Sequence, residues 1–363
     1  MKPRLRHVAE LAGVSQATVS RVLNDKPGVS PPTRREVLLA LRQLGYQPTG
    51  LKQTPRAGLV GLIVPELSNP VFPRFAQAIE SLLANHGLIT VLCTSTPSGM
   101  SEADYVELLL DQSVTGIVII SGTHADTEAD DALYRDLAAR RLPTVLVNGT
   151  VRSLGLSTVT VDHAEAARMS VAHLASLGHT AIGLALGPHR YLPSLAFIEG
   201  YHAGMAQAGL EVVAGRISET LYSIEGGHAA GIRQLEQGTT GVVCASDHIA
   251  LGVIRAARED GRRVPEEISV IGFDDAGSNA YVDPPLTSVQ QQFEAMASAI
   301  VRLLTRAIAD PGSAPSALSF RPELIVRNST GAAPDRAATT ASTTTSDATA
   351  DATGDATESA VTA

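Results

Sequence analysis

Polar side chains and one arginine near the N-terminus are spaced to share one face of a short helix. Val19, Val22 and Leu23 recur at helical intervals and predict the buried face. The opposite face presents Gln16, Ala17, Thr18, Ser20 and Arg21. Such side chains hydrogen-bond to base edges and phosphates, and none is bulky enough to keep the helix out of a DNA groove. The pattern predicts a DNA-contacting helix, with a phosphate contact alone as the alternative role of Arg21.

A second set of polar residues follows the apolar stretches in the rest of the chain. The set consists of Asn69, Ser121, Asn148, Asp247 and Asp274. In open parallel sheets, ligands bind beyond the carboxyl ends of the strands. Amide, hydroxyl and carboxylate groups at those ends suit a small polar ligand in a cleft. The alternative is that Asp274 and its neighbour Asp275 only cap the following loop.

The sequence offers little support for catalysis. Adjacent carboxylates such as Asp274 and Asp275 diverge on an extended chain, unlike a working carboxylate pair. No nucleophile elbow or phosphate-binding loop is present. Cys93 and Cys244 lie far apart without a CxxC partner, which argues against zinc-ribbon and iron–sulfur sites. We therefore expect no catalytic residue, no metal site, no cofactor and no enzymatic activity.

The elements around the DNA-contacting helix have helix-turn-helix spacing. Val8, Leu11 and Ala12 give the preceding helix its apolar face, and a glycine-containing turn ends it. Ser15 is placed to cap the second helix, and Ser30 to cap a third. Two prolines follow Ser30, where the first turn of a helix tolerates them. The sequence therefore predicts three short helices in an all-α head.

Charge is distributed unevenly between this head and the rest of the chain. Residues 1–56 carry ten Lys and Arg against three acidic residues, whereas the remainder carries 18 basic and 34 acidic side chains. A basic end is typical of a segment that contacts a polyanion, although chance is the alternative. No apolar stretch approaches the ~20 residues of a membrane span, and no secretory signal is present. We therefore expect a cytoplasmic, nucleoid-associated protein.

Apolar strands alternate with amphipathic helices after the head. Strands are expected at 60–64, 89–92, 117–120, 144–147, 159–161, 182–186, 242–244 and 269–273. Helices are expected at 75–85, 102–110, 164–176, 225–235, 249–259 and 293–309. This alternation favours two doubly wound parallel-sheet lobes, split near residues 155–162.

The chain therefore divides into four expected parts. These are the head at 1–48, a short linker at 49–58, a two-lobed α/β body at 59–330 and a tail at 331–363. The tail is almost entirely Ala, Thr, Ser and Asp. Such a segment cannot bury enough apolar area to offset the entropy of ordering it, so we expect it to be disordered.

The head resembles that of the lactose-repressor (LacI/GalR) family of bacterial transcription regulators, through the stretch VAELAGVSQATVSRVLNDKPGVSPPTRREVLLALRQLGYQP. The resemblance continues through GLIVPELSNPVF, CASDHIALGVIRAARE, ISVIGFDD and DPPLTSV, and it covers residues 4–330. A helix-turn-helix match alone is weak, but this ordered series of motifs is specific. It implies a periplasmic-binding-protein-like body, an effector site between the lobes and a homodimer.

The resemblance assigns roles to residues of the head. In the family, the first two positions of the second helix and a later arginine read the major groove, and here these are Gln16, Ala17 and Arg21. A bidentate pair between Arg21 and guanine is worth roughly 1–3 kcal/mol of discrimination. The expected phosphate contacts, which fix register without reading sequence, are Ser15, Thr18, Ser20 and Asn24.

The segment after the head departs from the family pattern. Members usually form a hinge helix there, whose leucine wedges into the minor groove. Here the segment is about three residues shorter than the family pattern, Pro55 stands where that leucine is expected, and Leu51 is the candidate substitute. A helix with Gly50 and Pro55 so close together is poorly favoured. We therefore expect an atypical hinge with Leu51 and Pro55 as its distinctive residues.

The resemblance also assigns effector contacts in the body. They fall on Asn69, Phe72, Ser121, Asn148, Asp247 and Asp274. Members that bind sugars or purines often carry an arginine three residues before a Gly-aromatic pair, and that position is Phe197 here. Arg190 is expected to supply a cation instead. Carboxylates such as Asp274 suit hydroxyl groups, so the expected effector is a sugar or a related polar metabolite.

Together these features predict a sequence-specific transcription regulator, a repressor by family default, that binds a palindromic operator in double-stranded DNA as a dimer. The effector would control DNA affinity through its differential affinity for two arrangements of the lobes. No leucine-rich C-terminal helix is present to tether dimers into tetramers. The alternative is a small-molecule (sugar) binding protein, or an enzyme, with an incidental basic N-terminus.

Overall fold

A computed structural model describes residues 5–23, 29–43, 58–96, 99–151 and 154–334. Its internal contacts divide the chain into two units between Gly58 and Leu59, which we call the head and the body. Three of the predicted site residues, Asn24, Leu51 and Pro55, lie outside the described residues.

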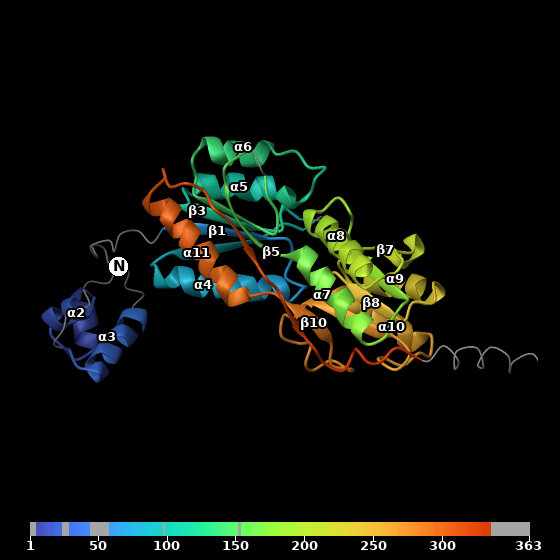
Figure 1. The fold of residues 1–363 in the computed structure, drawn as a ribbon. Coiled ribbons are helices and arrows are strands. Elements are labelled where there is room, and N and C mark those ends of the chain that lie inside the picture. The colour runs from blue at the N-terminus through green and yellow to red at the C-terminus, as the bar shows by residue number, and fades with distance from the viewer. Residues whose placement is uncertain (1–4, 24–28, 44–57, 97–98, 152–153, 335–363) are drawn as a thin grey trace, which may run out of the picture. The chain divides into compact units, whose positions relative to one another are not determined.

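The described residues of the head form three helices, α1 (Leu5–Leu11), α2 (Gln16–Leu23) and α3 (Pro31–Gln43) (Figure 1). Their small core is formed by Val8, Ala9, Val19, Val22, Val37, Ala40 and Leu41. Both predicted caps are confirmed, because the Ser15 hydroxyl accepts from the Thr18 amide at 3.1 Å and the Ser30 hydroxyl from the Thr33 amide at 3.3 Å. The prediction for Leu11 is wrong: its side chain is exposed, and Ala9 takes the buried position because the helix ends at Leu11.

The first lobe of the body is a parallel six-stranded sheet. Its order is β11 (Ala317–Phe320), β5 (Ser157–Val161), β4 (Thr144–Val147), β3 (Gly116–Ile120), β1 (Leu59–Val64) and β2 (Ile89–Thr94). The helices are α4 (Val71–Asn85), α5 (Glu102–Asp111), α6 (Ala132–Ala139), α11 (Phe293–Ala309) and the 3-10 turn η1 (Thr123–Ala125). Alternate strand residues face opposite layers: Leu62 packs in the core with α4 and α11, and Ile63 in the core with α5 and α6.

The second lobe repeats this plan. Its sheet has the order β12 (Glu323–Ile325), β10 (Thr287–Gln290), β9 (Ser269–Asp274), β8 (Gly241–Cys244), β6 (Ile182–Leu186) and β7 (Ile217–Glu219). The helices are α7 (His163–Ser176), α8 (Leu192–Gln207), α9 (Ile224–Glu236), α10 (Asp247–Glu259) and the turn η2 (Ala214–Arg216). Only the β10–β12 pair among the described strands is antiparallel.

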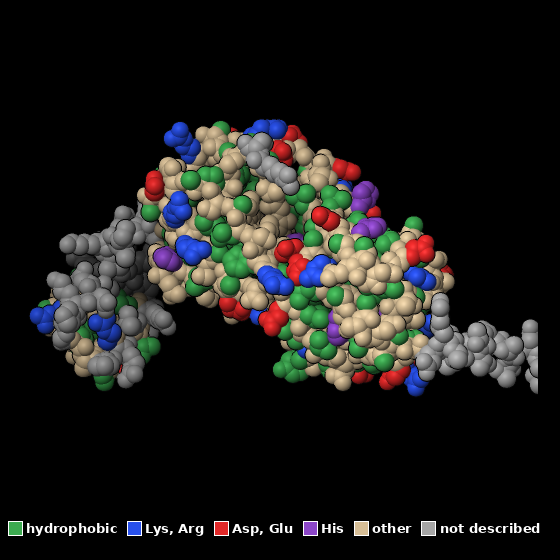
Figure 2. Space-filling view, viewed as in Figure 1, with side chains coloured by type: hydrophobic (Ala, Val, Ile, Leu, Met, Phe, Trp, Pro, Cys, Tyr) green, Lys and Arg blue, Asp and Glu red, His purple; other side chains and the backbone are tan. Residues whose placement is uncertain are grey.

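The chain crosses between the lobes three times. The first crossing, from β5 to α7, lies at the end of the predicted split, and two more join β10 to α11 and β11 to β12. The prediction of one split was therefore incomplete, because the later crossings use short strands with little apolar periodicity. Acidic and basic side chains gather at the junction of the lobes on the face shown in Figure 2. In the last crossing, Arg321 pairs with Glu165 of α7 at 3.2 Å.

All eight predicted strands and all six predicted body helices are present within a few residues. The sequence analysis missed α8 because its apolar residues surround the helix and leave no amphipathic stripe. It missed β11 and β12 because these strands are short and half exposed. Beyond residue 330, the Gly331 amide donates to the Ser269 hydroxyl at 3.0 Å and the Ala333 amide to the Leu177 carbonyl at 2.9 Å. Contacts of the body therefore continue past its expected end.

Candidate functional site

The exposed face of α2 carries the side chains that the sequence predicts to contact DNA. Ser15, Gln16, Ala17, Ser20 and Arg21 are exposed, whereas Thr18 is half-buried because its hydroxyl lies 2.9 Å from the Ser15 hydroxyl at the cap. Val19 and Val22 point into the core of the head. The helix therefore offers a polar surface with one guanidinium group, on a rigid element held by its buried valines.

A cavity of about 230 Å³ lies between the two lobes of the body. Its polar lining consists of Glu66, Asn69, Ser121, Asn148, His163, Ser246, Asp274 and Gln291. Its aromatic lining consists of Phe72, Tyr191, Phe197, Tyr222 and Phe273. Six of the eight predicted effector contacts are among these residues, namely Asn69, Phe72, Ser121, Asn148, Phe197 and Asp274.

Three cavity residues at strand ends have unusual backbone geometry. Ser121, Asn148 and Asp274 have φ values of 48°, 61° and 117°, in a region that non-glycine residues seldom adopt. Each stands at the carboxyl end of its strand, where the backbone turns toward the cleft. Such strain persists only where the surrounding structure enforces it, and it concentrates at functional sites.

Two side-chain oxygens in the cavity have no partner. Asn148 Oδ1 and Gln291 Oε1 are buried and accept no hydrogen bond. The Gln291 amide donates to Asp274 at 2.6 Å, and the Asn148 amide lies 3.5 Å from the Ser121 hydroxyl. Leaving a buried acceptor unpaired costs roughly 1–3 kcal/mol. A hydroxyl donor that reached these two oxygens would remove that cost.

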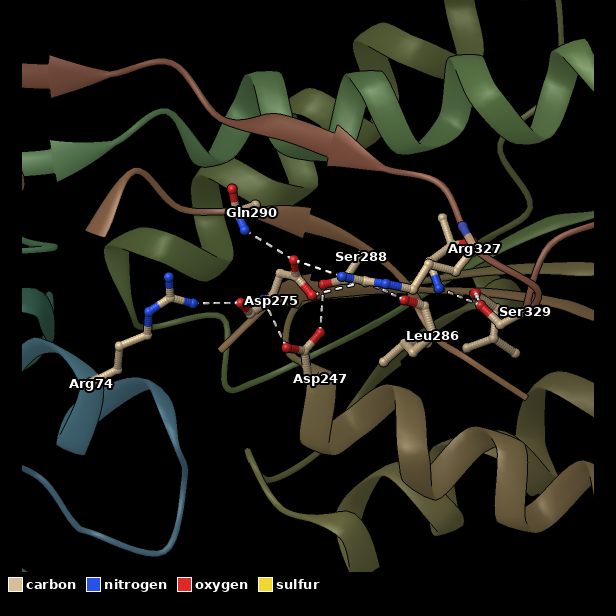
Figure 3. A network of polar contacts seen from close by, with 10 residues as sticks. Arg74, Asp247, Asp275, Leu286, Ser288, Gln290, Arg327 and Ser329 are labelled. Atoms are coloured by element: carbon tan, nitrogen blue, oxygen red, sulfur yellow. Dashed lines mark hydrogen bonds and ion pairs between the residues drawn. The ribbon is translucent and has the colours of Figure 1, made fainter. Parts of the chain in front are cut away.

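Asp247 lies below the cavity and does not line it. This first residue of α10 accepts from the Ser288 hydroxyl at 2.6 Å and the Asp275 amide at 2.8 Å (Figure 3). A Cβ atom at position 272 would lie 2.3 Å from an Asp247 oxygen, so only glycine fits there. Asp247 therefore supports the Asp274–Asp275 turn from beneath, and its predicted effector contact is absent from this geometry.

Asp275 joins the same network from the opposite side. Its carboxylate pairs with Arg327 at 2.9 Å and accepts from the Gln290 amide at 3.0 Å (Figure 3). Arg74 of the first lobe donates to the Asp275 carbonyl at 2.9 Å. This turn is therefore attached to both lobes.

Burial changes the protonation of the groups around the cavity. Desolvation and the nearby Asp247 carboxylate raise the pKa of Asp274 well above its ordinary value, and burial raises the pKa of Asp247 to about 7 despite the hydrogen bond from Ser288. Burial lowers the pKa of His163 to about 4, and this neutral ring lies 5.4 Å from the Phe273 ring. Burial therefore favours the neutral forms of Asp274 and His163, the two groups among these that line the cavity.

Arg190 does not line the cavity. Its guanidinium lies 3.3 Å from the Asp126 carboxylate and 5.1 Å from the centre of the Tyr191 ring. Arg190 was expected to meet the effector. In this geometry its guanidinium is instead paired with acidic groups of the first lobe.

Several cavity residues were missed by the sequence analysis. Gln291 follows β10, which was not predicted, and Tyr222 lies in the loop after the missed strand β7. Tyr191 directly precedes the missed helix α8. His163 lies between the strand predicted at 159–161 and the helix predicted at 164–176, so the rule of strand ends could have found it.

No described helix is long and apolar enough to cross a membrane. Across the same described ranges, no group of three His, Cys, Asp or Glu side chains is arranged to hold a metal ion.

A helix-turn-helix head joined to a two-lobed α/β body defines a ligand-responsive DNA-binding regulator. Residues 4–49 match the family model described as bacterial regulatory proteins, lacI family, and residues 171–330 match a periplasmic binding protein-like domain. The chain is 48% identical to the HTH-type transcriptional regulator MalR of Streptomyces coelicolor over 339 residues, 92% of this chain and 98% of the relative. The chain belongs to the LacI family.

Solved structures agree with this assignment. The complex of the transcriptional regulator CelR with cellobiose is 31% identical, with a TM-score of 0.68 over 90% of this chain and 100% of the CelR chain. The lac repressor dimer bound to operator and the anti-inducer ONPF is 28% identical, with a TM-score of 0.69 over 92% of this chain and 100% of that chain. The predictions of fold, family and a DNA-binding transcription regulator are confirmed, and the family consists of regulators rather than enzymes.

Proposed function

We propose that this regulator represses transcription from a palindromic operator as a homodimer, and that a neutral sugar in the interlobe cavity controls its DNA affinity. The main support for a sugar effector is the pair of buried acceptors without partners, Asn148 Oδ1 and Gln291 Oε1. A polyhydroxylated ligand supplies the donors that both oxygens need. We further propose that α2 reads the operator, with Arg21, Gln16 and Ala17 at base edges and Ser15, Thr18, Ser20 and Asn24 at phosphates.

The charge of the cavity favours an uncharged ligand. None of the described residues that line it is a lysine or an arginine, so a phosphate or carboxylate group would lose its hydration without a cationic partner. Burial raises the pKa of Asp274 and so favours its neutral form, and the pKa of His163, lowered to about 4, leaves that ring neutral near pH 7. Hydroxyl groups, which donate and accept, satisfy such a lining.

The aromatic side chains supply the remaining recognition. Phe72, Tyr191 and Tyr222 line the cavity from both lobes. Flat apolar rings together with a few polar groups suit the apolar faces and polar edges of a sugar ring. The CelR relative was solved with cellobiose, which makes a gluco-disaccharide the first ligand to test here.

Calorimetric titration of the full-length protein with glucose, cellobiose, maltose, maltotriose and ribose tests the effector class. Glucose 6-phosphate serves as the charged counterpart. We expect a neutral sugar to bind and the phosphate ester to bind at least tenfold more weakly. Binding only by the phosphorylated sugar, or by none of these sugars, would contradict the proposed effector class.

The unpartnered oxygen of Gln291 gives a sharper test. Gln291→Met keeps the length of the side chain but removes its amide. This substitution should lower the affinity for the sugar about tenfold. Gln207→Met, on the exposed surface of α8, is the matched control and should leave affinity unchanged. Equal affinities in both variants would exclude Gln291 from the site.

The dimer is proposed to form through the face that carries α4 and β2. A groove of about 360 Å³ there is lined by Leu62, Leu67, Pro73, Ala76, Gln77, Glu80, Thr90 and Leu92. Leu67 and Leu92 are exposed by 49% and 45%, and the neighbouring Ile89 by 54%. Exposed apolar side chains gathered along one face mark an interaction site, and a second copy of the chain is the proposed occupant.

Sedimentation of the purified protein tests the dimer. Leu92→Glu should shift the dimer toward monomer, because it places a charge in the proposed interface. Leu108→Glu, at an exposed leucine of α5 on the opposite layer of the lobe, is the control. A wild-type monomer at micromolar concentration would refute this part of the proposal.

The organisation proposed for the chain follows the expected parts. Residues 1–48 form the operator-binding part of the head, 49–58 an atypical linker, 59–330 the body and 331–363 the tail, whose first residues still contact the body. Because an operator reader acts on chromosomal DNA, we assign the protein to the cytoplasm and the nucleoid. Selection of bound sequences from random duplexes at a stated salt concentration tests the operator, and recovery of no motif would contradict it.

A further inference from the structure

Two loops from different lobes meet beside the cavity. Asp126, after the turn η1 of the first lobe, forms an isolated antiparallel bridge with Tyr191, which precedes α8 of the second lobe. The Thr127 amide and hydroxyl both donate to the Arg190 carbonyl, at 2.9 and 2.8 Å. Arg190 Nε lies 3.3 Å from the Asp126 carboxylate. We call these four residues, Asp126, Thr127, Arg190 and Tyr191, the clasp.

The clasp adjoins the cavity directly. Tyr191 and Ala125, which precedes Asp126, both line it. The Arg190 guanidinium lies over the Tyr191 ring, and one of its amino groups donates to the Tyr191 hydroxyl at 3.1 Å. The position of an aromatic wall of the cavity therefore depends on a side chain that pairs with the opposite lobe.

A buried network fixes the first-lobe side of the clasp. The Glu102 carboxylate accepts from the Thr123 amide at 3.0 Å and from the Tyr134 hydroxyl. The Tyr134 hydroxyl in turn accepts from the His124 amide at 2.8 Å, and the His124 ring lies 3.0 Å from the Val147 carbonyl. Since these side chains hold residues 123 and 124 in place, the loop presents Asp126 from a rigid base.

We propose that Arg190 and Asp126 are positioning residues that hold the two lobes closed around the effector. Their contacts join different lobes, so they stabilise only the arrangement in which the lobes are this close. The apparent affinity for a ligand that needs the closed arrangement falls with the fraction of closed molecules. The clasp therefore sets how tightly the cavity retains its ligand. This inference rests on the proposed effector site.

The clasp is separate from the other lobe contact described above. Arg74 donates to the Asp275 carbonyl from α4, whereas the clasp joins the loops that precede α6 and α8. The lobes therefore keep the Arg74–Asp275 contact when the clasp is removed. Exposed ion pairs contribute little, but the Asp126 side chain is only 12% exposed. We expect Arg190→Gln to weaken ligand affinity about three- to tenfold.

Distance measurements in the full-length protein test the clasp without relying on a ligand. Cysteines introduced as Glu107→Cys on α5 and Ala206→Cys on α8 are exposed, whereas Cys93 and Cys244 are buried. Spin labels at the two new cysteines report the separation of the lobes. Mixing with excess unlabelled protein keeps distances within one chain dominant. The control is Arg140→Gln, whose ion pair with Asp136 at 2.6 Å lies within α6 alone.

Arg190→Gln and Asp126→Asn should each shift the ligand-free distances to longer values, and the double variant should shift them by less than the sum of the two single shifts, because both variants break the Arg190–Asp126 pair. Added cellobiose should shorten the distances, and it should do so at higher concentration in the variants. Arg140→Gln should match the wild type. If the ligand-free distance distribution of Arg190→Gln is the same as that of the wild type, the proposal that the clasp holds the lobes together is overturned. Failure of every tested sugar to bind overturns the effector proposal, while the ligand-free distances still judge the clasp.

Discussion

The head and the body place their functional residues in different ways. In the head, the residues proposed to contact DNA are sequence neighbours on or beside one helix, and a small core of buried residues, seven among those that the structure describes, holds that helix. In the body, the cavity combines residues as distant as Glu66 and Gln291, which meet only after both sheets have formed. The helix surface follows from local periodicity, whereas the cavity follows from topology.

The two regions also differ in how they treat charge. The α2 surface keeps Arg21 exposed to water, where its charge is available to a polyanion. The body buries Asp247, Asp274 and Asp275, each less than 10% exposed, below and beside the cavity. Burial raises the pKa values of Asp247 and Asp274, which ties ligand affinity to structure. Substitutions in the head should therefore change DNA binding alone, and substitutions in the body should change ligand binding and pH response.

The largest effect is expected at Arg21. Arg21→Ala should weaken binding to the selected operator by about 3–4 kcal/mol, because a dimer loses one guanine contact in each half-site and each is worth roughly 1–3 kcal/mol. Fluorescence anisotropy at fixed salt measures this loss. Sugar affinity should be unchanged. A uniform loss on operator and random DNA, with a salt slope reduced by about one per lost contact, would show that Arg21 contacts only phosphate.

The second prediction concerns pH and belongs to the body. Burial raises the pKa of Asp247 to about 7, while an unfolded aspartate titrates near ~4. Between those values the folded protein holds a proton that the unfolded chain has lost, so this group's stabilising contribution is complete below about pH 4 and is lost as pH rises to about 7. Relative to wild type, Asp247→Asn should therefore gain on the order of 3 kcal/mol of unfolding free energy across that window.

The difference in unfolding free energy between wild type and Asp247→Asn is measured by urea unfolding at several pH values, with hydrogen exchange in α10 and β9 as the probe. His124 and His163, whose pKa values burial lowers to about 4, contribute with the opposite sign because they lose stability as pH falls. Their contribution is common to both proteins and cancels in the comparison. A difference independent of pH would mean that Asp247 is ionised in the folded protein throughout the window.

The features that could be predicted from the sequence are those set by neighbouring residues. Val19 and Val22 define the buried side of α2, and the caps Ser15 and Ser30 define where α2 and α3 begin, because these signals act within one turn of helix. The strand-end rule found Ser121, Asn148 and Asp274 for a similar reason, since each directly follows a strongly apolar strand.

The missed features depend on distant parts of the chain. Gln291 lies in the second crossing, and nothing near it in the sequence indicates that the chain returns there to the first lobe. Asp247 and Asp274 both follow apolar strands, yet only Asp274 lines the cavity. Asp247 is the first residue of α10, and its carboxylate accepts a hydrogen bond from Ser288 instead. Arg190 was predicted to meet the effector, and only the folded structure places Asp126 of the other lobe beside it.

The third prediction concerns the buried cores of the head and of the body. Val19 in the head and Val243 in β8 of the body are both fully buried, and Val→Ala at either position should cost about 2 kcal/mol from lost burial and the remaining cavity. The consequences should differ, because small domains have little stability to lose. Val19→Ala should reduce hydrogen-exchange protection throughout α1, α2 and α3 and weaken operator binding by the fraction of unfolded heads. Val243→Ala should leave the head protected and the body folded. Unchanged protection of α2 in Val19→Ala would show that the stability of the head does not depend on the packing of Val19.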